Sequence, residues 1–252
     1  MLKIAFGEAA ASLGKTLIVA DLHLGIELEL RARGINARQQ WHPCAVRINK
    51  LLKKMKCGSL VILGDAKHDV YGCDIEERTM MRRFLDSLDT KDVRIIKGNH
   101  DSLLEGVAPI IPATGMRIED GGESYGLFHG HAWPAKDVLA ADIFLMAHQH
   151  PMYEFKDKAG RWSEKCWISA ETKANKRFGV MGKRRVVVFP AFGILSGGIR
   201  LNAEKGIGPF FENPLLRKAT AFSLEGAPLG ALSVSRPKPY TVLYTSFPED
   251  IF

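Results

Sequence analysis

Five short apolar runs in this chain each end in side chains that could bind a metal ion or move a proton. The runs are TLIVADLHLG, GSLVILGDAKHD, DVRIIKGNHD, SYGLFHGH and ADIFLMAHQH. Oxygen and imidazole donors without cysteine suit Mn²⁺, Fe or Zn²⁺ better than they suit a thiolate site. One such ending is unremarkable, but five in sequence order indicate a shared site. The candidate residues at these endings are Asp21, His23, Asp65, Asn99, His100, His129, His148 and His150.

The last run ends in two histidines one residue apart, His148 and His150. Residues two apart in a strand point to the same face, so we expect both rings on one side. Taken alone, this pattern is more often a pair of half-exposed rings than a metal site. The other four endings favour metal ligation here.

The segments between these runs predict the elements that position them. Short apolar runs bounded by Gly and polar residues indicate buried strands. The segment ARQQWHPCAVRINKLLKKMK predicts a helix with Val46, Ile48, Leu51, Leu52 and Met55 on its apolar face, and DIEERTMMRRFLDSL predicts another. Strands that alternate with helices indicate an α/β fold with parallel strands, in which sites form outside the carboxyl ends of the strands.

The pattern changes after about residue 150. A hairpin is predicted around Ala159 and Gly160, and RRVVVFPAF predicts a further strand. We therefore expect the last hundred residues to form a second sheet that packs on the first. The predicted organisation is a single domain over 1–252, with a motif-bearing half (17–151), a second-sheet half (152–235) and a C-terminal extension (236–252).

Composition bounds the class of protein. The chain has 252 residues, a formal charge of +7 and a pI near 9.2, which mildly favours an anionic partner. No apolar run approaches the roughly 18 residues of a membrane span, and the N-terminus lacks the layout of a signal peptide. The cysteines, Cys44, Cys57, Cys73 and Cys166, form no Cys-x-x-Cys pair, so we expect reduced thiols and a cytoplasmic protein.

The blocks DLH, GDAKHD, GNHD, HGH and AHQH resemble, in this order, the five signature blocks of the calcineurin-like metallophosphoesterases, over roughly residues 17–151. The tail VVFPAFGILSGGIRLN and then NPLLRKA resemble a prokaryotic, largely archaeal group of predicted phosphoesterases related to the SbcD nuclease and similar to DNA ligase- and helicase-associated phosphoesterases. The resemblance implies a four-layer α/β/β/α sandwich with two packed mixed sheets. It also implies two divalent metal ions, with Mn²⁺ expected first and Fe, Zn²⁺ or Ni²⁺ as alternatives.

The resemblance further implies a role for each matching residue. His100 would protonate the leaving oxygen or stabilise the phosphate charge. His68 follows the nuclease pattern as a second catalytic residue, and its alternative is an exposed loop histidine. The resemblance assigns Asp21, His23 and His150 to one metal ion, assigns Asn99, His129 and His148 to the other, and makes Asp65 the bridge.

Three further residues are expected to support the ligands. Asp69 and Asp101 are candidate partners that fix imidazole tautomers, and His131 belongs to the same supporting set. Asp101 could equally be the N-cap of a helix over SLLEG. The family usually has Gly at the position of Ala147, and Ala would be strained there if a positive φ were required.

Basic clusters are the candidate substrate contacts. Arg31, Arg33 and Arg38 precede Trp41, and an aromatic ring among arginines can stack a base. The segment KANKRFGVMGKRR contributes cations that include Lys176 and Arg177. The alternative for each cluster is a solvated surface.

The leading function is a nuclease-like, metal-dependent phosphodiesterase that uses a hydroxide bridging the two metal ions. The alternatives are a small-molecule phosphoesterase acting on cyclic nucleotides or nucleotide-linked pyrophosphates, and a non-catalytic scaffold of the same fold. Expected partners are a nucleic acid or nucleotide and no membrane. A homodimer is left open, as is a DNA-repair ATPase, ligase or helicase partner, which rests on the resemblance alone.

Overall fold

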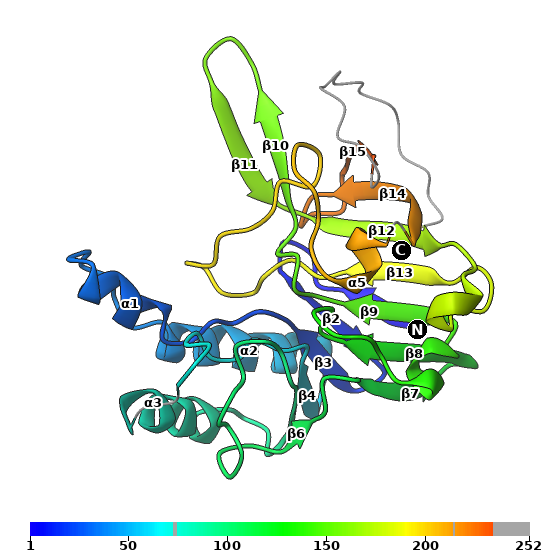
Figure 1. Cartoon of the computed structure of the whole chain (residues 1–252). Coiled ribbons are helices and arrows are strands. Elements are labelled where there is room, and N and C mark those ends of the chain that lie inside the picture. The colour runs from blue at the N-terminus through cyan, green and yellow to red at the C-terminus, as the bar shows by residue number, and fades with distance from the viewer. Residues whose placement is uncertain (73–74, 214, 234–252) are drawn as a thin grey trace.

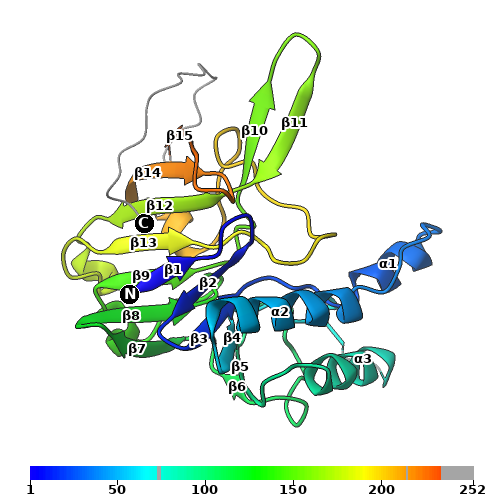
Figure 2. The same ribbon diagram turned by 180° about the vertical axis from the view of Figure 1, so that it is seen from behind.

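The computed structural model describes residues 1–72, 75–213 and 215–233. Two large sheets pack face to face, with helices on the outer side of the first sheet and a two-stranded hairpin projecting from the second (Figures 1 and 2). The predicted four-layer α/β fold with two packed mixed sheets is confirmed. Cys73 and the C-terminal extension over 236–252 lie outside the described residues, and the predicted single domain stays a prediction.

The first sheet has the strand order β1-β2-β3-β4-β5-β6. Strands β3, β4, β5 and β6 run parallel, and β1 and β2 join them as an antiparallel edge. Three of the five predicted strands therefore lie in this sheet. Its members are β1 (Leu2–Ile4), β2 (Ala10–Leu13), β3 (Thr16–Val19), β4 (Ser59–Ile62), β5 (Asp92–Ile96) and β6 (Ile110–Ile111).

The second sheet has the strand order β15-β14-β12-β13-β9-β8-β7, and β13, β9 and β8 run parallel within it. The expected second sheet is present, but β7, β8 and β9 of the motif-bearing half also belong to it, and β13 pairs with β9 to join the two halves of the chain. Its members are β7 (Met116–Asp120), β8 (Glu123–Phe128), β9 (Ile143–Met146), β12 (Trp167–Thr172), β13 (Arg185–Val188), β14 (Leu216–Phe222) and β15 (Pro228–Leu232).

The two long helices cover the outer face of the first sheet (Figure 1). These are α2 (Trp41–Met55) and α3 (Ile75–Asp86), close to the predicted ranges. Helix α2 buries Ala45, Ile48, Leu51 and Leu52, whereas Val46 is exposed. The sequence predicts Val46 on the buried face because its side chain is apolar. In the 3.6-residue period, however, Ala45 and not Val46 lies on the same face as Ile48 and Leu52.

One apolar cluster lies between the two sheets and holds them together. Ile18 and Val61 of the first sheet pack against Leu127 and Leu145 of the second, and all four are fully or almost fully buried. The outer face of the second sheet is covered by loops and by α4 (Lys136–Leu139), the 3₁₀ helix η1 (Lys176–Phe178) and α5 (Pro209–Glu212). The fourth layer is therefore thin.

The predicted hairpin is present as β10 (Met152–Lys156) and β11 (Arg161–Lys165), which form a separate two-stranded sheet. At its base, Met152 also forms a parallel bridge with Arg200. Cys44, Cys57 and Cys166 are free thiols. Within the described residues, no helix has both the length and the apolar character that a membrane crossing requires.

Candidate metal centre

The candidate ligands lie just beyond the carboxyl ends of five parallel strands. Two of them follow β3, Asp65 follows β4, Asn99 follows β5, and the remaining histidines follow β8 and β9. Three of these strands belong to one sheet and two to the other, so the site lies where the edges of two packed sheets meet. The carboxyl-end rule thus located the residues, although the sequence did not show that two sheets share them.

One group of ligand atoms comes from Asp21, His23, Asp65 and His150, and these atoms lie within 4.8 Å of one another. The Nε2 atoms of His23 and His150 are 3.1 Å apart, and His150 Nε2 lies 3.4 Å from Asp21 Oδ1. Two imidazole nitrogens this close cannot both carry a proton without repulsion. The arrangement is one in which lone pairs converge on a cation.

A second group comes from Asp65, His129 and His148, again within 4.8 Å. His129 Nε2 lies 3.3 Å from Asp65 Oδ2 and 3.2 Å from the side-chain oxygen of Asn99. Asp65 therefore belongs to both groups. This grouping coincides with the two expected ligand sets and their expected bridge, and the ligand roles themselves stay a prediction.

Backbone carbonyls fix the ring orientation of three of the histidines. His129 Nδ1 donates to Leu63 O at 2.7 Å, and His150 Nδ1 donates to Gly197 O at 2.9 Å. His100 Nδ1 donates to the backbone carbonyl of His68. A proton on Nδ1 leaves the Nε2 lone pair free to ligate, as is usual at metal centres.

Asp21 provides the test of whether the site fits a metal ion. Its side chain is fully buried, and neither carboxylate oxygen has a hydrogen-bond partner among the described residues. The nearest imidazole nitrogens are 3.4 and 3.6 Å from Oδ1. A buried carboxylate without hydrogen bonds is costly unless a cation lies beside it. The donor set therefore fits divalent metal ions.

The electrostatics of the cluster agree with this fit. Burial lowers the pKa of His23 to about 2 and that of His148 to about 3, so both rings are neutral, as ligands must be. Burial opposes protonation of His129, but the Asp65 carboxylate outweighs it and raises the pKa of His129 to about 9. The His129 charge in turn holds the pKa of Asp65 below its usual range against the effect of burial. A divalent cation would take over the balancing role of that proton.

Left-handed backbone is concentrated at the ligands. Asp21, His23, Asp65, His148 and His150 have φ values of 53°, 47°, 51°, 71° and 41°. Such conformations are rare outside glycine and cluster at functional sites. The two histidines after β9 therefore reach the site through local turns, and the explanation by strand alternation is wrong, because β9 ends at Met146.

Ala147 is not strained by a positive φ, unlike its neighbour His148. Its amide donates to His129 O at 2.8 Å, which continues the pairing of the two ligand-bearing strands. The doubt raised by the substitution of the usual glycine at this position is therefore removed.

His68 and His100 lie together beside the first group. Their rings stack with centroids 5.5 Å apart, and His23 belongs with them to a third set of converging nitrogens. His100 Nε2 faces the cluster, 4.0 Å from Asp65 Oδ2. His68 is not the exposed loop residue of the alternative interpretation, since its side chain is only 20% exposed.

The supporting residues act differently from expectation. Asp101 is fully buried and accepts hydrogen bonds from backbone amides, including those of Asp65 and Gly98, both at 2.8 Å. No helix follows Asp101, since residues 102–107 form turns, so the N-cap prediction is wrong. Asp69 accepts from the Tyr71 amide at 3.0 Å. His131 lies beside two ligand rings, 5.2 Å from His129 and 6.0 Å from His148 between centroids.

Two supporting residues were missed by sequence reasoning. Glu29 accepts a hydrogen bond from His68 at 2.8 Å, and Lys67 is fully buried beneath the same loop. The Lys67 ammonium donates to the carbonyls of Asp69 and Gly72 and lies 3.4 Å from Glu77 Oε2. Only the position of Lys67 inside the GDAKHD block could have signalled it.

Four of the six predicted substrate residues lie in two separate places. Arg31 and Arg33 lie on the exposed helix α1 (Ile26–Ala32) and just after it, near the His68 end of the site. Lys176 and Arg177 lie before β13, whose first residue pairs with the first residue of β9. The candidate ligands follow the last residues of β9. The two cations therefore lie near the opposite ends of these strands from the candidate ligands.

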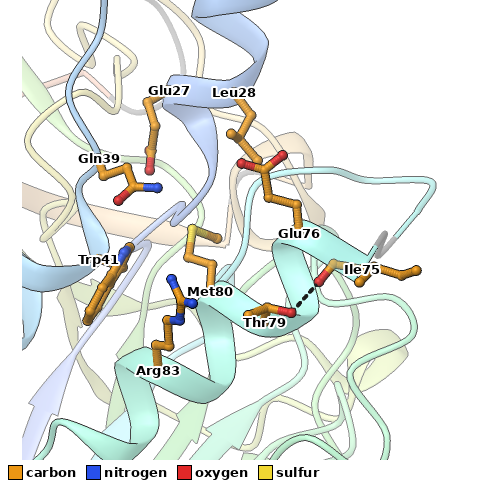
Figure 3. Close-up of a pocket in the computed structure, with 9 residues that line it drawn as sticks. All are labelled: Glu27, Leu28, Gln39, Trp41, Ile75, Glu76, Thr79, Met80 and Arg83. Atoms are coloured by element: carbon orange, nitrogen blue, oxygen red, sulfur yellow. Dashed lines mark hydrogen bonds between the residues drawn. The ribbon is translucent and has the colours of Figure 1, made fainter.

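Trp41 lines a pocket of about 430 Å³ between α1, the start of α2, and α3. Figure 3 shows its ring forming one wall, with Arg83 and Met80 beside it. Arg38 is exposed on the segment that leads to Trp41. The pocket is lined by Glu27, Leu28, Gln39, Trp41, Ile75, Glu76, Thr79, Met80 and Arg83.

The fold of the chain is that of the metallophosphoesterases, as comparison with solved structures shows. The chain superposes on the Pseudomonas putida nuclease MPE with a TM-score of 0.54 and 19% identity, covering 91% of this chain and 99% of the nuclease. At this level of identity the likeness establishes the fold.

Weaker matches include the phosphoesterase Yfce from E. coli, with a TM-score of 0.42, 14% identity, and coverage of 87% of this chain and 99% of that one. A predicted phosphoesterase from Streptococcus pneumoniae matches with a TM-score of 0.32, 12% identity, and coverage of 84% and 91%. No family model and no curated protein matches the chain.

Proposed function

We propose that this chain is a metal-dependent phosphodiesterase with a nuclease-like substrate range. The observation that carries the proposal is the sharing of Asp65 between two groups of converging ligand atoms. A carboxylate in that position can bridge two cations, which is the arrangement used for in-line phosphoryl displacement. The fold shared with a nuclease is consistent with this chemistry.

The proposed ligand roles are those that the resemblance implies, and the grouping of the side chains supports them. Asp21, His23 and His150 would hold one divalent ion, and Asn99, His129 and His148 the other, with Asp65 between them. Bound metal ions would lower the pKa of a water molecule and neutralise charge on the phosphate. Because only two of the seven ligands are carboxylates, the filled centre would keep the positive charge that an anionic diester needs. The oxygen and imidazole donors suit Mn²⁺, with Fe, Zn²⁺ and Ni²⁺ as alternatives.

His100 would act as the general acid or as a stabiliser of phosphate charge. Its Nδ1 proton is committed to the backbone carbonyl of His68, so Nε2 is the atom that faces the cluster and the substrate. A ring fixed in this way presents one defined nitrogen to a leaving oxygen. Stacking against His68 restricts the same ring from its side.

A polynucleotide is the proposed substrate, and the formal charge of +7 suits such an anion. Arg31 and Arg33 lie on the side of the site where His68 contacts α1, so they are the proposed phosphate contacts from the substrate set. Because Lys176 and Arg177 lie near the opposite ends of β9 and β13 from the candidate ligands, they are not proposed as contacts of a substrate bound at the metals.

The test is an activity panel on metal-stripped protein reloaded with Mn²⁺, alongside His100→Ala. The substrates are bis-p-nitrophenyl phosphate, p-nitrophenyl phosphate, a 2′,3′-cyclic nucleotide, and single- and double-stranded DNA. We expect diester and DNA cleavage that falls at least roughly 100-fold in His100→Ala, the usual size of a lost acid–base contribution. Metal content should be the same in both proteins. Cleavage confined to small diesters would favour a small-molecule phosphoesterase, and no turnover with two metals bound would favour a scaffold.

A further inference from the structure

A continuous line of hydrogen-bonding groups leads from the surface of α1 to the metal-ligand cluster. Glu29 Oε2 lies 2.8 Å from His68 Nε2, and His68 Nδ1 lies 3.3 Å from His23 Nδ1. His23 Nε2 then faces the cluster, 3.6 Å from Asp65 Oδ2. The line therefore joins a carboxylate, two imidazoles and the proposed metal position.

The chemistry of these groups sets the direction of each hydrogen bond. An ionised carboxylate can only accept, so His68 Nε2 must donate to Glu29. A neutral His68 ring then has a lone pair on Nδ1, which can only accept from His23. His23 must therefore carry its proton on Nδ1, and its Nε2 lone pair is directed into the cluster. Each bond determines the next, starting from the carboxylate.

Glu29 is itself held in place from both sides. One oxygen binds His68, and the other forms an ion pair with Arg33, one helical turn further along the chain. Helix α1 carries Glu29, and Arg33 directly follows the last residue of this helix. The helix is preceded by Gly25, directly after the DLHL block, where a φ of 100° turns the chain. The side chain of Glu29 is 47% exposed, so it is not required for the core.

We infer that Glu29 is a positioning residue of the proposed metal centre, which fixes through His68 the tautomer of the ligand His23. The inference rests on the proposed function, because His23 is a ligand only if the cluster binds metal. It assigns to Glu29 the role that sequence analysis gave to Asp69, whose carboxylate instead accepts from a backbone amide. Without the Glu29 acceptor, His68 is free to place its proton on Nδ1, and His23 would then turn a proton, not a lone pair, toward the metal.

The first measurement is Mn²⁺ affinity by titration calorimetry for the wild type, Glu29→Ala, Glu29→Gln and the control Glu76→Ala. Glu76 is an exposed glutamate of the neighbouring helix α3, so its loss matches the change in charge without touching a histidine. We expect Glu29→Ala to weaken Mn²⁺ binding at the position held by His23 by roughly 10–100-fold. Removal of a hydrogen-bond partner of a metal ligand usually has an effect of this size. Glu29→Gln keeps an acceptor oxygen and should lose less Mn²⁺ affinity than Glu29→Ala. Glu76→Ala should bind Mn²⁺ as tightly as the wild type does.

The second measurement is the ¹⁵N chemical shift of the His23 ring nitrogens in metal-free protein. The wild type should show a proton on Nδ1, and Glu29→Ala should populate the Nε2–H form. A wild-type tautomer in Glu29→Ala, or Mn²⁺ affinity equal to that of Glu76→Ala, would overturn the inference. If the wild type takes up no divalent ion, the proposed function fails, whereas normal uptake by both wild type and Glu29→Ala refutes only the role of Glu29.

Discussion

Replacement of Asp101 by Ala should destabilise the fold and the metal centre together. The Asp101 carboxylate is fully buried and accepts from the amides of Asp65, Ala66 and Gly98, each at 2.8 Å, and from Lys67 at 3.3 Å. A buried donor left without a partner costs about 1–3 kcal/mol. The three short bonds together therefore predict a loss of about 3–9 kcal/mol, a large part of the ~5–15 kcal/mol that stabilises a typical domain.

Asp101→Asn is the matched variant because it keeps the shape of the side chain. One carboxylate oxygen of Asp101 accepts hydrogen bonds from the amides of Ala66 and Lys67. The other accepts from the amides of Asp65 and Gly98. An amide has one acceptor oxygen, so one of the two pairs must face an NH₂ group. We therefore expect Asn to lose about half of the stability that Ala loses, roughly 2–4 kcal/mol.

The assay is thermal unfolding followed by circular dichroism, with and without Mn²⁺. At about 2–4 °C per kcal/mol, the Ala variant should melt roughly 6–36 °C below the wild type and the Asn variant about half as far below. A melting temperature of Asp101→Ala within about 2 °C of the wild type would refute the reasoning. If turnover alone were lost, Asp101 would be acting on an imidazole ring, as the sequence first suggested.

Three further outcomes follow from the geometry of the site. Gly98→Ala should abolish metal binding, because an added Cβ would lie 2.1 Å from Asp65 Oδ1. Gly58→Ala is the control, because a Cβ there meets open space, and this variant should bind metal normally. Metal analysis of the purified proteins measures both. Tyr71 is 93% exposed on the loop after the second ligand block, where its ring could stack on a base. Tyr71→Ala should therefore raise the KM for DNA and leave the hydrolysis of small diesters unchanged. Equal effects on both substrates would exclude a role of Tyr71 in DNA contact. Mn²⁺ affinity should rise with pH up to about 9, because the metal must displace the proton of His129, and affinity independent of pH from 6 to 9 would contradict the pKa of about 9 on that ring.

The strand endings were predictable because two local properties determine them. Apolar runs of strand length identify the buried strands, and the polar residues that follow must lie at the sheet edge. The division of those strands between two sheets was not predictable in the same way. Pairing of β9 with β13 depends on residues about forty positions apart, and the sequence of β9 alone suits either sheet.

The supporting contacts could not be read from residue type. Asp101 and Asp69 are both acids that follow a histidine of the site, yet both accept from backbone amides. Glu29 is an ordinary exposed helix residue in the sequence, and only the direction of α1 brings it to His68. Residue type also could not place the basic segment around Arg177. This segment precedes β13, and only the direction of β13 in the sheet shows that it lies away from the site.

The backbone at the ligands indicates that the fold, more than the metal, sets the geometry of the centre. Each non-glycine residue in the left-handed region costs on the order of 1 kcal/mol, and such a cost persists only where surrounding contacts determine the conformation. Those contacts are present. The amides of Asp21 and His23 donate to Gly64 O and Asp65 O at 3.1 and 2.9 Å, and the amide of Asp65 donates to Asp101. Since these bonds involve protein atoms alone, the fold itself positions the candidate ligands, and a metal ion that binds them would not have to order them.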